Sequence, residues 1–261
     1  MQVSGAMRGT SATAAGTRPN PVTLDRQRTQ VATGVAIALA GTATLALAFM
    51  LARLAAGDLG LVARAFAYAV LGGGLLARLA ATHHGAPTLG AANAVTLARG
   101  VIVLDLLAVL GSTPGRVLAW SIVALALLAL ALDGVDGKVA RSRGEESAFG
   151  ARFDMETDAL LILVLCALAW QQGKAGAWIL LAGALRYLFV AAGFALPWLA
   201  RALPPSRRRQ TVCVVQIVSL ILCLLPVVVP PASTAIGAVG LVLLLGSFAA
   251  DVAWLARRAR A

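Results

Sequence analysis

Four aspartates, Asp133, Asp136, Asp154 and Asp158, lie within one short segment near the middle of the chain. Apolar sequence surrounds them, and ionisable side chains within an apolar bundle are rare and usually paired, metal-bound or functional. Four neighbouring carboxylates need positive charge nearby, and oxygen-only ligands favour hard cations such as Mg²⁺ or Mn²⁺. Two such ions about 3.5 to 4 Å apart suit phosphoryl transfer, because they bridge a diphosphate and lower the pKa of an attacking hydroxyl.

The spacing of these residues predicts two helices whose carboxylates face each other. Asp133, Gly137 and Arg141 recur at four-residue intervals and therefore share one side of a helix. Asp154 and Asp158 repeat that interval on the next helix. The absence of a side chain at Gly137 leaves room for a ligand or a partner helix to approach closely.

The composition is that of a polytopic all-α membrane protein. Hydrophobic residues make up 60% of the 261 residues and charged residues only 13%, with a mean hydropathy of +0.86, whereas soluble domains contain about 25% charged residues. Only helices or closed barrels satisfy their backbone hydrogen bonds in lipid, and barrel-type alternation is absent. Hydrophobicity predicts eight spans, at residues 31–56, 60–82, 93–112, 116–137, 149–170, 176–199, 211–229 and 234–256.

The basic residues indicate an orientation and argue against nucleic acid as a partner. The net charge is +11, but the basic residues lie between hydrophobic spans and form no single soluble patch. An even number of spans places both termini on one side, and most Lys and Arg residues then lie at the inner ends. We therefore expect a multi-pass protein of the plasma membrane whose termini and Asp cluster are cytoplasmic.

The aspartate spacing resembles the signature of the CDP-alcohol phosphotransferase (CDP-alcohol phosphatidyltransferase) family. Its fixed positions are matched by Asp133, Asp136, Gly137, Ala140, Arg141, Gly150, Asp154 and Asp158. The segment Asn93-x2-Thr96-x2-Arg99 is similar to the family's entry to its first core helix. The resemblance covers about residues 90–256 and implies a six-helix catalytic domain, assigned to residues 85–261. We assign residues 31–84 to an additional transmembrane hairpin and residues 1–30 to a flexible cytoplasmic tail.

The resemblance also implies a role for each matching residue. Two Mg²⁺ or Mn²⁺ ions would be held by Asp133, Asp136, Asp154 and Asp158, with Asp158 also acting as the general base. The CDP moiety would be bound by Asn93, Thr96, Gly137, Arg141 and Ser147. An alcohol hydroxyl would attack the lipid-proximal phosphorus of a CDP-linked substrate and release CMP. A homodimer is expected from the resemblance alone.

Other charged residues leave two interpretations open. Arg186 lies within an apolar span, where it either binds a phosphate of the acceptor or pairs with Asp105 as a structural bridge. Arg207 and Arg209 precede the seventh span and either bind the acceptor phosphate or anchor the helix on anionic lipid. Asp251 is expected to pair with Arg257 or Arg258 at the end of the last helix.

The leading functional hypothesis is a transferase of phospholipid synthesis that uses CDP-diacylglycerol and a small polar alcohol, preferably a phosphorylated one. A second enzyme hypothesis reverses the roles, with a soluble CDP-alcohol donating its phospho-alcohol to a lipid acceptor. A transporter of cations or metabolites belongs to another class. The transporter is disfavoured because the aspartates cluster at one face and no second half of the chain repeats them in inverted order.

Overall fold

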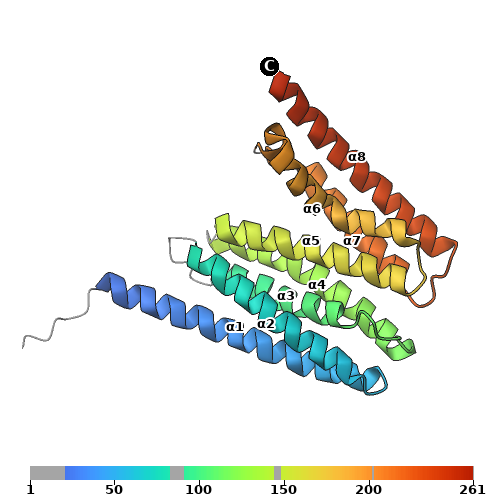
Figure 1. Cartoon of the computed structure of the whole chain (residues 1–261), viewed down its shortest axis with the longest axis horizontal. Coiled ribbons are helices and arrows are strands. Elements are labelled where there is room, and N and C mark those ends of the chain that lie inside the picture. The colour runs from blue at the N-terminus through green and yellow to red at the C-terminus, as the bar shows by residue number, and fades with distance from the viewer. Residues whose placement is uncertain (1–20, 83–90, 144–147, 202, 261) are drawn as a thin grey trace, which may run out of the picture.

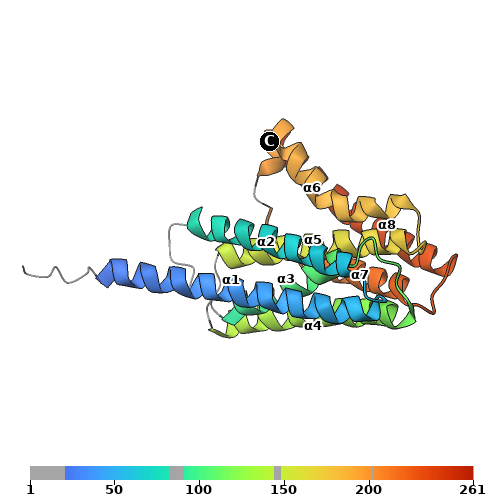
Figure 2. The same ribbon diagram turned by 60° about the horizontal axis from the view of Figure 1, so that its bottom comes forward.

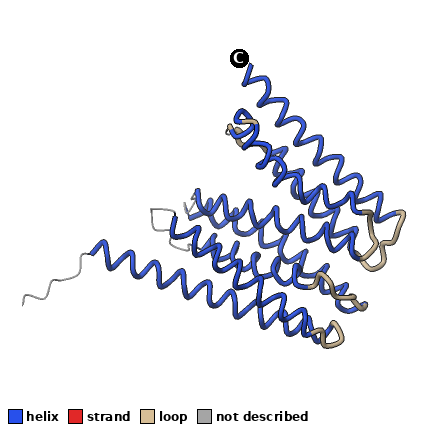
Figure 3. The backbone as a smooth tube through the Cα atoms, in the orientation of Figure 1, coloured by secondary structure: helices blue, strands red, loops and turns tan. Residues whose placement is uncertain are grey.

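The chain forms a bundle of α-helices (Figure 1), described here from a computed structural model for residues 21–82, 91–143, 148–201 and 203–260. The helices are α1 (Pro21–Leu54), α2 (Leu59–Thr82), α3 (Ala91–Ala108), α4 (Arg116–Arg143), α5 (Ala148–Gln171), α6 (Leu180–Ala195), α7 (Arg207–Leu224) and α8 (Ala232–Arg260). Short 3-10 turns flank α6, and no strand occurs in these four ranges (Figure 3). The predicted all-α membrane fold is confirmed.

Five of the eight helices are long and apolar enough to cross a membrane. The five stretches are residues 31–54, 59–78, 116–134, 177–195 and 232–259. Of the other three helices, α5 and α7 carry their charged residues in the N-terminal part, whereas α3 has Arg99 in its middle and Asp105 near its C-terminal end. Helix α5 packs against α3, α6 and α7, and its Leu161, Leu165 and Leu168 are wholly buried. A helix that is apolar on every side beyond its first turns is suited to this central position.

The bundle has two unlike ends. At the turn end, the connections α1–α2, α3–α4, α5–α6 and α7–α8 lie together, and from there α6 and α8 diverge from α5 (Figure 1 and Figure 2). The opposite end, called the Asp end, contains the C-terminal part of α4 and the N-terminal part of α5. The predicted catalytic residues therefore lie where the helices spread apart.

Polar side chains join the α1–α2 hairpin to the remaining helices at the turn end. Arg64 Nε donates to the carbonyl of Ala108 at 2.8 Å, and its Nη2 contacts Ser112 Oγ at 2.7 Å. Arg64 also forms an ion pair with Asp58 at 3.1 Å, and Ser112 Oγ donates to Asp58 at 2.6 Å. Gln171 of α5 donates to the Ser112 carbonyl at 2.7 Å. One network thus fixes the hairpin against α3 and α5.

Several helix boundaries differ from those predicted by a few residues, and α1 and the sixth span differ most clearly. Helix α1 begins at Pro21, so residues 21–30 of the expected tail are helical. Proline suits this first position because its fixed φ is helical and its missing N–H is not needed there. The sixth span is not continuous either, because α6 ends before Pro197, which begins the 3-10 turn Pro197–Ala200. Proline disfavours the helical conformation in the residue that precedes it.

The turn-end network predicts an acid-sensitive contribution to stability. The hydrogen bond from Ser112 and the adjacent Arg64 hold the pKa of Asp58 below its usual value. A carboxylate with a lowered pKa stabilises the folded protein above its unfolded pKa of about 3.9, and loses this effect as the pH falls through the folded value. We expect Asp58→Asn to lower Tm by roughly 2 to 4 °C at pH 7.

Thermal unfolding of both purified proteins in one detergent, from pH 7 to pH 3, measures this effect. The difference in Tm should shrink below about pH 4, where Asp58 of the unfolded chain is protonated. A difference that stays constant over the whole range would contradict the assignment of this stability to the Asp58 carboxylate.

Candidate active site

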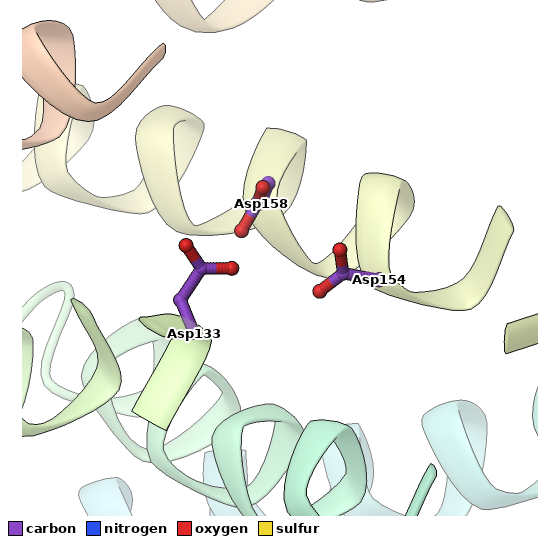
Figure 4. A group of neighbouring side chains, drawn as sticks. All are labelled: Asp133, Asp154 and Asp158. Atoms are coloured by element: carbon purple, nitrogen blue, oxygen red, sulfur yellow. The ribbon is translucent and has the colours of Figure 1, made fainter. Parts of the chain in front are cut away.

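Three of the four predicted aspartates meet between α4 and α5 at the Asp end. Asp133 projects from α4 toward Asp154 and Asp158, which lie one turn apart on α5 (Figure 4). Each carboxylate offers an oxygen, and these oxygens all lie within 4.8 Å of one another. All three residues are half-buried. The four-residue spacing on α5 therefore brings two carboxylates onto the face that meets α4, as the sequence predicted.

The guanidinium of Arg99, on α3, lies among these carboxylates. Its Nη1 is 3.0 Å from Asp133 Oδ1 and 2.5 Å from Asp154 Oδ1, and its Nη2 donates to Asp158. Arg99 is 0% exposed, so its charge depends on these partners for compensation. Among the described residues, one guanidinium faces three carboxyl groups at this site. Carboxyl groups gathered in this way suit the binding of a further cation.

Arg99 is the residue of this site that the sequence analysis did not assign. In the sequence, Arg99 is the last residue of the Asn93-x2-Thr96-x2-Arg99 segment, and that segment alone gives it no role. One feature of the sequence could have indicated this role. Arg99 lies inside an apolar helix, where an ionisable residue is rare and usually paired, and the nearby aspartates needed positive charge. Asn93 and Thr96 are buried at three-residue intervals ahead of Arg99 on α3. The three residues thus form one buried polar stripe.

The donor set of the cluster fits a hard divalent cation. Asp133, Asp154 and Asp158 supply only carboxylate oxygens. Mg²⁺ binds oxygen at about 2.0 to 2.1 Å, so opposite ligands of one ion lie about 4.2 Å apart. The three carboxyl groups offer oxygens within 4.8 Å of one another, so they are close enough to share one such ion. The Arg99 guanidinium pairs with the same three carboxyl groups, so it and an entering cation would compete for them.

The remaining predicted residues around the CDP moiety are only partly described. Asp136, Gly137 and Arg141 belong to the helical backbone of α4, but their side chains lie outside the described residues. Ser147 lies outside them altogether. The roles assigned to these four positions stay predictions.

Arg186 does not pair with Asp105, so that interpretation is wrong. Its guanidinium binds Glu156 of α5 in bidentate fashion, with Nη2–Oε1 at 2.5 Å and Nε–Oε2 at 3.3 Å. Glu156 projects from α5 toward α6, and these two helices are in contact, whereas α3 does not contact α6 within the described residues. Asp105 is wholly buried on α3, and no hydrogen-bond partner for its carboxylate occurs in the described part of the chain.

The predicted pairing of Asp251 with Arg257 or Arg258 is also wrong. Asp251 of α8 accepts from Arg208, and from Arg209 at 3.3 Å, because α7 and α8 pack against each other as antiparallel neighbours. Arg258 instead lies 4.5 Å from the ring centre of Trp254. Arg207 is exposed and forms no ion pair with any described residue.

Comparison with known protein families identifies the class of this chain. The family model for CDP-alcohol phosphatidyltransferase matches residues 89–246, which is more than half of the 261 residues. The chain belongs to this family, and it is an integral membrane enzyme that transfers phosphate-containing groups from CDP-alcohols. No curated protein and no solved structure matches it. The family generally uses divalent metal ions, which agrees with the donor set of the aspartate cluster.

Replacing Arg99 with alanine tests its electrostatic role. Loss of the guanidinium removes the ion-pair partner that three neighbouring carboxylates share. Breaking a buried ion pair typically lowers the stability of the folded protein by about 3 to 5 kcal/mol. We expect Arg99→Ala to lower Tm strongly in chelator-treated protein and to gain more Tm on addition of Mn²⁺ than the wild type gains. Thermal unfolding with chelator and with Mn²⁺ measures both changes.

Arg116→Ala is the matched control, because Arg116 is an exposed arginine at the opposite end of α4. It should respond to Mn²⁺ as the wild type does. Equal Mn²⁺ responses of Arg99→Ala and Arg116→Ala would show that Arg99 and the cation do not share the carboxylates.

Proposed function

We propose that this enzyme transfers a phosphatidyl group from CDP-diacylglycerol to the hydroxyl of a small polar alcohol. The observation that supports this most directly is the cluster of Asp133, Asp154 and Asp158, placed across α4 and α5 within a chain of this family. The acceptor oxygen attacks the phosphorus that bears the diacylglycerol. The bond from that phosphorus to the CMP oxygen breaks, CMP leaves, and the acceptor hydroxyl proton passes to Asp158.

The residue roles follow from the donor chemistry of the site and from the family. Asp133, Asp136, Asp154 and Asp158 would hold two Mg²⁺ or Mn²⁺ ions. When bound, such ions neutralise charge on a diphosphate and favour deprotonation of an attacking hydroxyl. Asp158 orients that hydroxyl and accepts its proton as the general base.

The CDP moiety lies between α3 and α4 in this proposal. Arg141 binds the diphosphate oxygens, since a guanidinium grips phosphate in bidentate fashion. Asn93 and Thr96 contribute from the buried stripe on α3. Gly137 and Ser147 complete the set, with Gly137 allowing the nucleotide to approach the α4 backbone.

We propose a phosphorylated alcohol, such as glycerol 3-phosphate or an inositol phosphate, as the acceptor. The support comes from the start of α7, where Arg207 is exposed and forms no ion pair among the described residues. Arg209 shares Asp251 with Arg208, so its charge is only partly compensated. Arg186 is a weaker candidate, because its bidentate pair with Glu156 must break before it binds a phosphate.

The proposed setting is the plasma membrane, with the Asp end and both termini in the cytoplasm. An even number of helices places the start of α1 and the end of α8 at one end of the bundle. Basic residues gather toward that end, which supports a cytoplasmic orientation. A homodimer is also proposed, on the family resemblance alone.

Release of CMP by the purified full chain tests the reaction. CDP-diacylglycerol and Mg²⁺ or Mn²⁺ are supplied with a panel of glycerol 3-phosphate, inositol phosphate, inositol, serine and phosphatidylglycerol. We expect acceptor-dependent CMP release that falls at least about 100-fold in Asp158→Asn, as is typical for loss of a general base. Binding of CDP to this variant should be largely retained, because most of the predicted CDP contacts are unchanged.

The outcomes separate the hypotheses. Full turnover by Asp158→Asn would overturn the general-base assignment. Silence across the panel from folded protein that still binds CDP would favour the reversed reaction, in which a soluble CDP-alcohol donates to a lipid acceptor. Silence without CDP binding would contradict both transferase proposals and would return attention to the transporter.

Arg207→Gln and Arg209→Gln test the acceptor class. If their guanidinium groups bind the acceptor phosphate, KM should rise about tenfold for a phosphorylated acceptor, since a charge-assisted contact contributes about 1.4 kcal/mol or more. The KM for CDP-diacylglycerol should stay unchanged. Arg257→Gln, an exposed change at the end of α8, is the control. An equal effect on phosphorylated and unphosphorylated acceptors would contradict this site.

A further inference from the structure

A cavity of about 510 Å³ lies on the side of α3 and α5 that faces the hairpin and α6. Its wall comes from α1, α2, α3 and α5, with Tyr187 added by α6. On α5 it is lined by Phe153 and Thr157, whereas Asp154 and Asp158 point toward α4 (Figure 4). With 100° of rotation for each residue, the lining residues and the aspartates lie on different faces of α5. The cavity is therefore separated from the carboxylate cluster by the α3–α5 layer.

Glycines shape this cavity. A Cβ added to Gly72 would lie 3.3 Å from Leu104, and one added to Gly73 would lie 3.0 Å from Ile37, so these two glycines let α2 approach α3 and α1 closely. Gly41 and Gly100 also line the cavity, and an added Cβ at either would meet no atom within 4 Å. These positions leave open space between helices that are otherwise in contact.

The length and the lining suit a hydrocarbon chain. From Phe149 to Leu160, the α5 side of the cavity spans about 16 Å at 1.5 Å per residue, close to half of a hydrocarbon core of about 30 Å. Its two threonine hydroxyls are already engaged within their helices, because Thr44 donates to Ala40 at 3.0 Å and Thr157 donates to Phe153 at 2.9 Å. The interior of the cavity therefore presents mainly apolar surface to a ligand.

Among the described residues, the charged side chains at the polar mouth of the cavity sum to a positive charge. Glu156 at this mouth is neutralised by its bidentate pair with Arg186. Arg152, one turn earlier on α5, is exposed and forms no ion pair with any described residue. A guanidinium at the mouth of an apolar, leaflet-deep cavity is complementary to a phosphate with an attached acyl chain.

We propose that this cavity binds one acyl chain of an anionic membrane phospholipid, with its headgroup phosphate at Arg152, as a lipid site distinct from the reactive carboxylates. The hairpin of α1 and α2 then has a definite role, since it supplies the outer wall of the site. The bound lipid fills the space between the hairpin and α3–α5, and thereby stabilises the contact between them.

The test uses delipidated full-length protein, phosphatidylglycerol and phosphatidylcholine with identical acyl chains, and native mass spectrometry to count retained lipids. Wild type should retain phosphatidylglycerol in preference to phosphatidylcholine. Gly41→Phe fills the cavity and should weaken retention about tenfold or more. Gly34→Phe is the matched control, because Gly34 lies two turns away on the same face of α1, outside the cavity, with no atom within 4 Å of an added Cβ.

Arg152→Gln keeps the packing intact and should remove the preference for the anionic lipid. A photoreactive group at the acyl terminus of phosphatidylglycerol should label α1, α2, α3 or α5 within the cavity. Retention by Gly41→Phe equal to that of Gly34→Phe, or labelling confined to other helices, would overturn the site. Displacement of phosphatidylglycerol by stoichiometric CDP-diacylglycerol would show that the cavity belongs to the lipid donor, which also overturns the proposal of a separate site.

Discussion

A wholly buried guanidinium among three carboxylates is the interaction on which the rest of this structure depends. Arg99 of α3 contacts Asp133 of α4 and both Asp154 and Asp158 of α5. Charges removed from water are tolerated only when their partners are held in place. The three helices must therefore keep a fixed arrangement, and the apolar packing along the rest of their length supplies it. A divalent cation entering the cluster would meet carboxyl groups that Arg99 already holds in position.

The turn end of the bundle is held together by polar contacts, whereas some helices diverge toward the Asp end. At the turn end, Arg64, Asp58, Ser112 and Gln171 connect the hairpin with α3 and α5. Lys174 adds a second tie there, because it donates to two carbonyls of the α7–α8 connection at 2.9 and 2.6 Å. From this fixed end, α6 and α8 diverge from α5 toward the Asp end (Figure 1). Chemistry at one end of a membrane bundle is possible because the opposite end holds the helices together.

The features that could be predicted from the sequence are those that depend on residue periodicity and on composition. The eight helices follow from apolar length, and the meeting of Asp133 with Asp154 and Asp158 follows from helical spacing. Contacts between side chains on different helices do not follow from spacing. Arg99 in the cluster, Arg186 on Glu156 and Arg208 on Asp251 all depend on which helices are neighbours, and a long arginine reaches several candidate partners. The proline at position 197 could have predicted the break in the sixth span, but the hydrophobicity of the surrounding residues favoured one continuous helix.

The two faces of α3 and α5 separate two kinds of recognition. One face carries Arg99 and the aspartates, which form ion pairs with one another. The other face carries Gly100, Phe153 and Leu160, where the requirement is space and an apolar surface. Helical periodicity places these residues on different faces, and the α1–α2 hairpin lines the second face. The residues matched to the family, 89–246, begin after that hairpin. The two helices of the hairpin therefore lie outside the matched segment, although they pack against its first helix, α3.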